Sequence, residues 1–534
     1  MIRRYRNRPQ AAEISLETWE LHFKTLFKHN KDYIVHLSVN HNKLMRQDEM
    51  LDADFTSLEV ELALNKVSSS KASGPDGIPG ALIKFGAKYL ITYLTKLFNS
   101  IYDVQKFPRD WSQSIIVPIH KSGCTSDPQN YRGISLLNIL SKVFSSIITK
   151  RLHNWCEENQ KLCIEQAGFR RDHSTIDHIF TLHAIITNAI YGKGRGKMYV
   201  AFVDYSKAFD SVIRPCLWDI LSSAGVSTKF LNMLKAMYDN VQACVRWNGS
   251  TTSFFECPNG TKQGAKESPI LFSLYINFVA DLIRQKGKHG VQMQSGKDEV
   301  FFLIFADDIA LLSTTPSGLQ NQITNLHDAS KLIGLEVNKS KTKVMVFRRG
   351  GFLAQGEKWF LDGSQLEVVN AFKYLGYTFT TKLSETIPLV NIASKAKMKT
   401  VSLLKTLRDI HTSKPKVFFK LFDAQIQPSL LYASELWGLN DHICVERSHL
   451  FACKRFLNVD VKACSSLVYG ETGRFPLVIN STIRAVKYWL KILKMPDHRL
   501  PKQALSMLAC APIPNDFNWL KSIELCLCKS GYGF

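Results

Sequence analysis

The segment that most constrains the fold is residues 300–312, in which the adjacent carboxylates of Asp307 and Asp308 interrupt an otherwise apolar run. A run this short and rich in phenylalanine and isoleucine is typical of a buried strand rather than a helix. The two aspartates are then expected at a tight turn between two strands. Because burying neighbouring carboxylates is very unfavourable, they must lie at a surface, be protonated, be paired or hold a cation. Oxygen ligands of this kind favour magnesium, although a plain hairpin turn explains the same residues equally well.

A second apolar segment, residues 200–203, runs directly into Asp204. If the two strands pair in one sheet, Asp204, Asp307 and Asp308 form a three-carboxylate cluster able to hold two divalent ions. Asp210 follows Asp204 after a short segment. It can join that cluster or cap the next helix, and we favour the cap.

The charge of the chain indicates the class of its partner. The chain has 534 residues, of which 45% are hydrophobic, and a formal net charge of +22. Its length predicts roughly two to four structural units, and its charge favours nucleic acid over a membrane surface as the partner. It has no apolar run long enough to cross a membrane and no signal peptide, and its cysteines form no CxxC pair. We therefore expect an intracellular protein of the nucleus or cytoplasm, not a secreted one, with no membrane partner.

A loop rich in glycine, proline and serine, residues 68–79, is a candidate for contact with a phosphate backbone through Lys71. The helix before it is predicted to start at a capping box formed by Thr56 and Glu59. A simple connection between two helices explains the composition of the loop equally well.

Residues 114–120 are predicted to form a strand, and Pro118 marks it as an edge or bulged strand. Lys121 and Arg132 flank the hairpin-like loop that follows. A point charge and a planar guanidinium on one loop suit a triphosphate, although two solvated surface cations are the alternative.

Between the two carboxylate strands, Gln263 and Gly264 precede a helix for which Ser268 is the expected N-cap and Pro269 the first helical residue. A glutamine bracketed by glycines before a helix N-terminus can approach a base pair and phosphates closely. By itself this signal is weak.

Residues 441–534 are predicted to be helical. The four side chains that suggest a zinc site have a spacing that matches no common zinc module, so we favour helix packing for His442, Cys444, His449 and Cys453.

Several short motifs occur in one order along residues 55–380. They are Lys71…Gly74-Pro75-Asp76-Gly77, Lys121-Ser122-Gly123, Tyr131-Arg132-Gly133-Ile134-Ser135-Leu136, Gln166-Ala167-Gly168-Phe169-Arg170, Asp204…Ala208-Phe209-Asp210, Gln263-Gly264…Ser268-Pro269, Phe305-Ala306-Asp307-Asp308, Gly334-Leu335…Asn338…Lys341-Thr342 and Phe372-Lys373-Tyr374-Leu375-Gly376. The ordered set resembles the reverse transcriptases of LINE-type (non-long-terminal-repeat) retrotransposons. Any one motif is modest, but their order is highly specific.

The resemblance implies an α+β right-hand polymerase with fingers, a palm with an antiparallel sheet, a thumb and a helical C-terminal extension. It implies an N-terminal extension at residues 1–54 and fingers and palm at 55–380, with the core at about 101–380. The thumb follows at 381–440, where a basic helix is expected along a template–primer duplex, and the helical C-terminal region at 441–534.

The resemblance also implies the roles of the site residues. The Asp204 and Asp307 positions bind two Mg²⁺ ions, with Asp308 beside them and Mn²⁺ as a substitute. Lys341 is our candidate acid for the leaving pyrophosphate, ahead of Lys343. The finger residues that hold the incoming dNTP are Lys121 and Arg132. The residues that shape the nucleotide and template pocket are Gln263 and Gly264. The primer-gripping hairpin contains Tyr374, Leu375 and Gly376.

Phe209 separates two polymerase hypotheses. Its ring, five residues after Asp204, is expected where a ribose 2′-hydroxyl would lie, so it favours DNA synthesis on an RNA template with a DNA primer. RNA polymerases of similar palm architecture usually need a small or polar contact there, and a core phenylalanine is the plain alternative.

The sequence departs from the family pattern at a few positions. Lys266 and Glu267 replace proline or another residue followed by leucine, and Phe278 replaces a common aspartate. The charge at Glu267 is expected to destabilise the nucleotide pocket. A second hypothesis is therefore a non-catalytic, retrotransposon-derived RNA-binding protein. No endonuclease signature is found, so a missing part of the element or another protein is expected to supply the nick.

Overall fold

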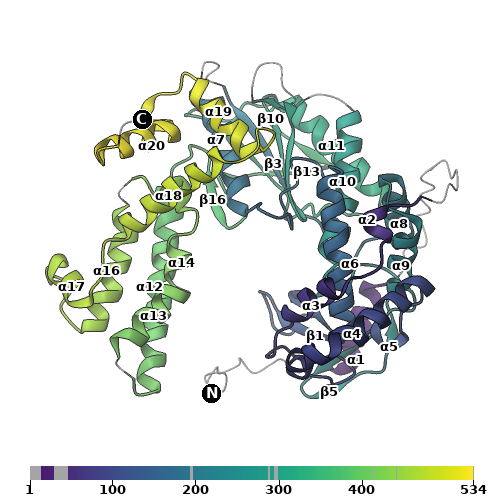
Figure 1. The fold of residues 1–534 in the computed structure, drawn as a ribbon. Coiled ribbons are helices and arrows are strands. Elements are labelled where there is room, and N and C mark those ends of the chain that lie inside the picture. The colour runs from purple at the N-terminus through teal and green to yellow at the C-terminus, as the bar shows by residue number, and fades with distance from the viewer. Residues whose placement is uncertain are drawn as a thin grey trace. The chain divides into compact units, whose positions relative to one another are not determined.

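The computed structural model describes residues 14–28, 46–192, 196–286, 289–293, 299–412, 414–440 and 442–532. The chain is α+β, as predicted, and divides into two compact units, each assembled from separate segments (Figure 1). The described parts of unit 1 come from Met1–Arg170, Tyr205–Lys286 and Asn325–Val337, and those of unit 2 from Arg171–Asp204, Gly287–Thr324 and Asn338–Phe534.

A small sheet forms part of unit 1, with the strand order β2-β1-β4-β5 and β6 paired to β4. Its strands are β1 (Gln113–His120), β2 (Tyr131–Leu137), β4 (Gln242–Trp247), β5 (Ser250–Thr251) and β6 (Phe255–Glu256). Strand β1 pairs antiparallel with β2 along its whole length and parallel with β4 only from Gln113 to Ile116. Pro118 therefore lies where β1 has no neighbour on the β4 side, which confirms the predicted edge position.

The helices of unit 1 begin at local sequence signals. Thr56 and Glu59 form the predicted capping box of α3. The predicted N-cap of α10 is wrong by one residue, because Glu267 occupies that position and the Ser268 hydroxyl donates to the Lys262 carbonyl at 2.8 Å. The helices are α1 (Leu16–Leu26), α2 (Glu49–Asp52), α3 (Ser57–Asn65), α4 (Gly80–Val104), α5 (Arg109–Ser112), α6 (Ile139–Glu158), α8 (Arg214–Ala224), α9 (Thr228–Tyr238) and α10 (Ser268–Gln285).

Unit 2 contains a second sheet with the order β14-β11-β3-β10-β9. The strands are β3 (Met198–Val203), β9 (Phe302–Phe305), β10 (Asp308–Ser313), β11 (Lys343–Phe347) and β14 (Glu367–Val368). Strand β3 lies at the centre, antiparallel to both β10 and β11, and all of its residues are buried. Its even-numbered residues share a core cluster with α7 (Thr175–Tyr191), so the apolar run that the sequence placed in a strand is covered on this face.

The rest of unit 2 is mostly helical, as predicted for the C-terminal region. Hairpin β15 (Ala371–Tyr374) and β16 (Tyr377–Thr380) precedes α12 (Thr386–Asp409), α13 (Pro415–Gln425), α14 (Gln427–Leu430), α15 (Ser434–Trp437), α16 (Ile443–Leu457), α17 (Ser465–Thr472), α18 (Leu477–Leu493), α19 (Leu500–Cys510) and α20 (Trp519–Lys529). His449 and Cys453 are buried on α16. Helix α11 (Pro316–Leu332) has residues in both units. No helix among the described residues has the length and apolar character that crossing a membrane requires.

Candidate functional site

The hairpin that carries the paired aspartates has the predicted form. Strands β9 and β10 are joined by a two-residue turn, with Phe305 opposite Asp308 in the ladder. Ala306 has φ of +60° at the first position of the turn, which is an unfavourable region for a residue with a side chain. Such local strain is found where the surrounding structure fixes a functional turn. Asp307 is half-buried and Asp308 is exposed, so both carboxylates lie at the surface of unit 2.

Asp204 lies at the same end of the sheet as this hairpin. Ile309 pairs with Val203, and the same register continued by one step sets Asp308 opposite Asp204. Asp204, the residue directly after β3, is also held by the segment that precedes β11. Asn338 donates its backbone N–H to the Asp204 carbonyl at 2.8 Å, and the Asp204 N–H donates to the Thr342 hydroxyl at 3.4 Å. Strand pairing therefore fixes the backbone of all three aspartates in unit 2.

One carboxylate oxygen of Asp204 has an environment that suits a cation. Its Oδ2 atom is buried and accepts no hydrogen bond, and the Nζ atom of Lys341 is 3.6 Å away. An ion pair at that distance is too long to satisfy the oxygen as a hydrogen bond would. Buried carboxylate oxygens in this state fit the hard oxygen ligands of a divalent metal.

The predicted three-carboxylate cluster is only partly reproduced. The described residues include no group of three or more His, Cys, Asp or Glu side chains placed to hold a metal ion jointly. The strand register brings Asp204 and Asp308 to facing positions, but it does not fix how the side chains are turned. The aspartates thus share one end of the sheet without forming a ready-made ligand set.

Lys341 and Lys343 occupy different surroundings in unit 2. Lys341 is largely exposed and its ammonium group faces Asp204. Lys343 belongs to β11 and is engaged by Glu367 at 2.7 Å and by the Ser340 carbonyl at 2.5 Å. Of the two lysines, Lys341 is the one whose ammonium group lies beside a candidate metal ligand.

Residues 371–380 form a tight hairpin, as the resemblance implied. Tyr374 pairs with Tyr377 across a turn made by Leu375 and Gly376, both with positive φ. The Tyr432 hydroxyl donates to the Leu375 carbonyl and to the Thr175 hydroxyl, which ties the turn to two helical segments of unit 2. Burial, reinforced by the negative charge of Asp308, raises the pKa of Tyr374 well above its ordinary value. The centroid of the Tyr374 ring lies 5.3 Å from that of Phe202 in β3, the strand that leads to Asp204.

Lys121 and Arg132 lie on the β1–β2 hairpin of unit 1. Arg132 pairs with Ile119, and the Lys121 N–H donates to the Asn130 carbonyl at 2.8 Å, at the mouth of the loop. Because side chains alternate along strands, the two cations are diagonal neighbours on one face of the hairpin. Both side chains are exposed. This is the arrangement that the sequence predicted for two cations on one loop.

Gln263 and Gly264 lie against the same hairpin. The Ser135 N–H donates to the Gln263 carbonyl at 2.9 Å. Gly264 has φ of +117°, and a Cβ atom there would approach the Ser135 carbonyl oxygen to 2.9 Å. Only glycine satisfies both conditions without strain. The loop therefore depends on glycine at this position.

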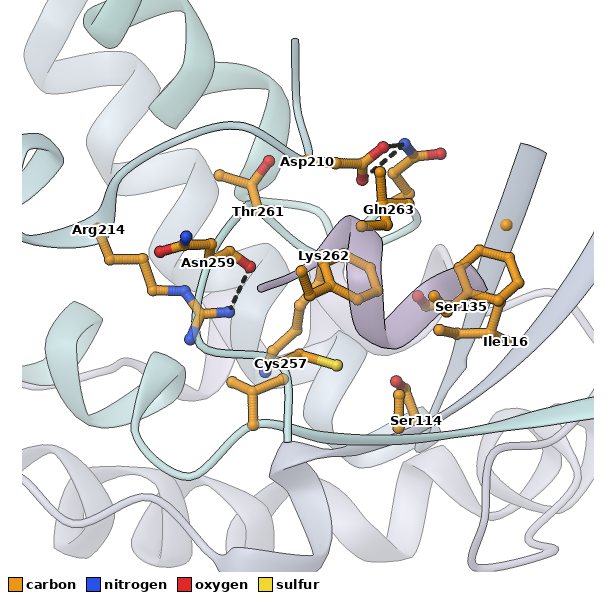
Figure 2. A pocket seen from close by; sticks show the side chains of 16 residues that line it. Ser114, Ile116, Ser135, Asp210, Arg214, Cys257, Asn259, Thr261, Lys262 and Gln263 are labelled. Carbon is orange, nitrogen blue, oxygen red and sulfur yellow. Dashed lines mark hydrogen bonds between the residues drawn. The ribbon is translucent and has the colours of Figure 1, made fainter. Parts of the chain in front are cut away.

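The predicted role of Asp210 as a helix cap is wrong. Helix α8 has Ile213 at its N-cap, whereas both carboxylate oxygens of Asp210 accept hydrogen bonds from Nε2 of Gln263, at 2.9 and 2.8 Å (Figure 2). Burial raises the pKa of Asp210 to about 6, against the opposing effects of the Gln263 hydrogen bonds and the charges of Lys207 and Arg132. The amide of Gln263 is thus oriented by a carboxylate that sequence analysis had assigned elsewhere.

Two buried cationic side chains that the sequence did not indicate, Arg214 and Lys262, hold the backbone around this loop by hydrogen bonds to carbonyl groups. Arg214 donates to the carbonyls of Gly260, Tyr238 and Asn259 at 3.0–3.2 Å. Figure 2 shows the bond to Asn259. Lys262 donates to the Met237 carbonyl at 2.9 Å. Arg214, Asn259 and Lys262 line a small cavity with about 30 Å³ of free volume, room for about one water molecule.

Lys262 has a counter-charge in Glu267. Burial lowers the pKa of Lys262 to about 8, and the negative charge of Glu267 opposes that shift. Glu267 is itself buried and accepts a hydrogen bond from the Ser145 hydroxyl. The residue that departs from the family pattern therefore has two compensating partners. The sequence offered one signal for the pair of Lys262 and Glu267: Lys262 directly precedes Gln263, a candidate site residue.

Phe209 is half-buried, which fits a ring that is held in place but still presents a surface. It stacks on Phe272 with ring centroids 4.5 Å apart and meets the edge of Phe169 at 6.3 Å. Its carbonyl accepts the Thr261 N–H at 2.8 Å, so the segment after Asp204 is bound to the loop that contains Gln263. The backbone at Phe209 is thus held against the loop that carries Gln263 and Gly264.

Comparison with known proteins places these features in a family. The model of the family "Reverse transcriptase (RNA-dependent DNA polymerase)" matches residues 119–379. The probable RNA-directed DNA polymerase from transposon BS of Drosophila melanogaster is 28% identical over 388 residues, covering 71% of this chain and 42% of the relative. The RNA-directed DNA polymerase from mobile element jockey of the same species is 27% identical, covering 73% and 42%.

A solved structure, apo telomerase from Candida tropicalis, is 12% identical and covers 55% of this chain and 59% of its own, with a TM-score of 0.37. A score this low does not establish a shared fold. The chain spans less than half the length of the two curated relatives named above. The match at residues 119–379 includes every candidate site residue in both units. Residues 119–379 therefore match the reverse transcriptase (RNA-dependent DNA polymerase) family, and the chain is similar to RNA-directed DNA polymerases of Drosophila transposons.

Proposed function

We propose that this chain catalyses RNA-templated DNA synthesis, the transfer of a nucleotide from a dNTP to the 3′-hydroxyl of a DNA primer. The observation that carries the proposal is the juxtaposition of Asp204 with the Asp307–Asp308 turn at one end of the unit 2 sheet, inside the region that matches the family. The elements that hold these aspartates are strands and a strained turn, which give a rigid backbone.

Asp204 and Asp307 are proposed to hold two Mg²⁺ ions, for which Mn²⁺ would substitute, with Asp308 beside them. When bound, such ions lower the pKa of the primer hydroxyl and stabilise the charge that develops on the α-phosphate. The buried, unbonded Oδ2 atom of Asp204 supports this assignment. Lys341 is proposed to donate a proton to the leaving pyrophosphate, because its ammonium group already lies beside Asp204.

Lys121 and Arg132 are proposed to bind the triphosphate of the incoming dNTP. Their position on one face of an exposed hairpin supports this, because a point charge and a planar guanidinium can contact different phosphate oxygens together. Gln263 and Gly264 are proposed to line the nucleotide and template pocket. The carboxylate of Asp210 fixes the Gln263 amide, so that Gln263 presents a defined edge to a base pair.

The primer and duplex are proposed to contact unit 2. The β15–β16 turn at Tyr374, Leu375 and Gly376 would hold the primer end, supported by its tie to Tyr432. Helix α12 is proposed as the thumb helix. Its basic side chains would neutralise phosphates of the template–primer duplex, and all are at least partly exposed: Lys395, Lys397, Lys399, Lys405 and Arg408.

The domain organisation remains a prediction. We propose fingers and palm at residues 55–380, a thumb at 381–440 and a helical region at 441–534, after an N-terminal extension at 1–54. The RNA template, DNA primer and dNTPs are the proposed partners, acting in the nucleus or cytoplasm. The endonuclease that would supply the nick is proposed to belong to another part of the element or to another protein.

Primer extension on an RNA template with Mg²⁺ and dNTPs tests the proposal, with wild type measured beside Asp307→Asn. We expect extension by wild type only, with template–primer affinity nearly unchanged in the variant, because the carboxylate binds metal rather than nucleic acid. A large loss of affinity in Asp307→Asn would contradict the metal-ligand assignment. Salt-sensitive template binding without extension by wild type would instead identify a non-catalytic RNA-binding protein.

A further inference from the structure

Helix α4 of unit 1 presents a row of exposed aromatic side chains. Phe85, Tyr89 and Tyr93 have exposed fractions of 80%, 75% and 74%. They recur every four residues, so they lie on one side of the helix with a rise of about 6 Å between neighbours. The opposite side, with Leu94 and Phe98, is buried where α4 packs on α3 and α6. We call Phe85, Tyr89 and Tyr93 the aromatic ridge.

Positive charge accompanies the aromatic ridge. Lys84, Lys88 and Lys96 are exposed on the same helix, and none of them forms an ion pair with an acidic side chain in the described parts of the chain. From Gly80 to Tyr102 the helix carries no acidic residue. An exposed apolar patch of this kind marks an interaction surface, and the lysines select a polyanionic partner over an apolar or acidic one.

We propose that the aromatic ridge binds single-stranded RNA, with unpaired bases stacked on the rings and the lysines contacting the phosphates. Stacking on successive aromatic side chains beside basic residues is the usual means of binding single strands without sequence preference. Duplex RNA offers no exposed base faces and would be bound only through its backbone. The ridge is distinct from the candidate residues for nucleotide binding and catalysis. The proposal rests on the proposed function, which gives the chain an RNA template.

The test is fluorescence anisotropy with a labelled oligo(U) of about 16 nucleotides, the upper end of the usual site size. The full chain is used without dNTPs. Wild type is compared with Phe85→Ala/Tyr89→Ala/Tyr93→Ala and with a matched control, Leu21→Ala/Leu58→Ala/Phe254→Ala, which removes exposed apolar side chains that lie on other segments of unit 1. Because all six side chains are exposed, their truncation is not expected to unfold the chain.

The ridge variant is expected to bind oligo(U) at least about tenfold more weakly than wild type, because each lost stack is worth ~1–3 kcal/mol and ~1.4 kcal/mol is tenfold. The control and the affinity for duplex RNA should not change. The variant Lys84→Gln/Lys88→Gln/Lys96→Gln should reduce the slope of log affinity against log salt by about 2, at ~0.7 per phosphate contact.

Unchanged oligo(U) affinity in the ridge variant would overturn the proposal. The same holds if sedimentation shows that the ridge variant has lost self-association while its RNA affinity is intact, because the ridge would then join two copies of the chain. Primer extension separates this from a failure of the proposed function. Wild type that binds oligo(U) through the ridge but does not extend a primer refutes only the catalytic proposal.

Discussion

Replacement of Glu267 by leucine tests whether the buried charges beneath the Gln263 loop act as a pair. Lys262 is buried, and its pKa is lowered from 10.5 to about 8 even with Glu267 nearby. At ~1.36 kcal/mol per pKa unit, burying this ammonium group costs roughly 3 kcal/mol at neutral pH. Without Glu267 the pKa of Lys262 should fall further, and full conversion to the neutral amine is the limit of that effect at pH 7.

The largest loss of stability is expected if Lys262 becomes fully neutral in the folded state. A lysine buried as the neutral amine at pH 7 costs roughly 5 kcal/mol relative to a pKa of 10.5, so the charge effect of Glu267→Leu is limited to roughly 1–2 kcal/mol. Loss of the hydrogen bond from Ser145 adds about 1 kcal/mol. We therefore expect the free energy of unfolding to fall by about 1–3 kcal/mol at pH 7. Glu267→Gln should lose less, because it keeps an acceptor for Ser145.

The pH dependence gives the sharper result. Because the folded-state pKa of Lys262 lies below its unfolded value, the unfolded chain binds more protons between the two, and stability rises with pH in that window. In wild type the window opens at about pH 8. In Glu267→Leu this window begins at a lower pH, so the free energy of unfolding should already rise between about pH 7 and 8. In wild type, Lys262 contributes no change in stability over that range.

Urea titrations followed by tryptophan fluorescence at several pH values measure this difference. The double variant Glu267→Leu/Lys262→Met should recover most of the lost stability and the wild-type slope between pH 7 and 8, because no buried lysine is left without its counter-charge. Equal urea midpoints for Glu267→Leu and wild type, or a double variant no more stable than the single one, would refute the pairing of Lys262 with Glu267.

The other predictions concern single residues of unit 1. Phe209→Ala should admit ribonucleotides in primer extension, because the ring is proposed to exclude the 2′-hydroxyl, and unchanged sugar selectivity would contradict the gate. Gly264→Ala should lower primer-extension activity at least several-fold, because the positive φ and the close approach to Ser135 both exclude a Cβ atom; a variant with wild-type KM for dNTPs would count against this. Burial raises the pKa of Asp210 to about 6, so stability should fall as pH rises from about 4 to 6, and Asp210→Asn, which keeps an acceptor for Gln263, should remove that fall in urea titrations.

The sequence by itself determined the local elements around the candidate site. The β9–β10 turn, the β1–β2 hairpin and the capping box of α3 were all predicted, because each depends on residues close together in the chain. It also determined the order of the family motifs, and thereby the match of residues 119–379 to the reverse transcriptase family. The length and charge of the chain predicted several structural units and a polyanionic partner.

Only the tertiary structure decided which polar side chains meet. Asp210 was predicted to cap α8, but it binds Gln263, 53 residues away. Glu267 was expected to destabilise its pocket, but it is buried with Ser145, 122 residues away, and opposes the desolvation of Lys262. Local patterns cannot show such pairs, because the free energy of a buried charge depends on partners that only folding brings near. The aromatic ridge on α4 followed the same rule: its spacing was visible in the sequence, but which side of the helix stays exposed was set by packing on α3 and α6.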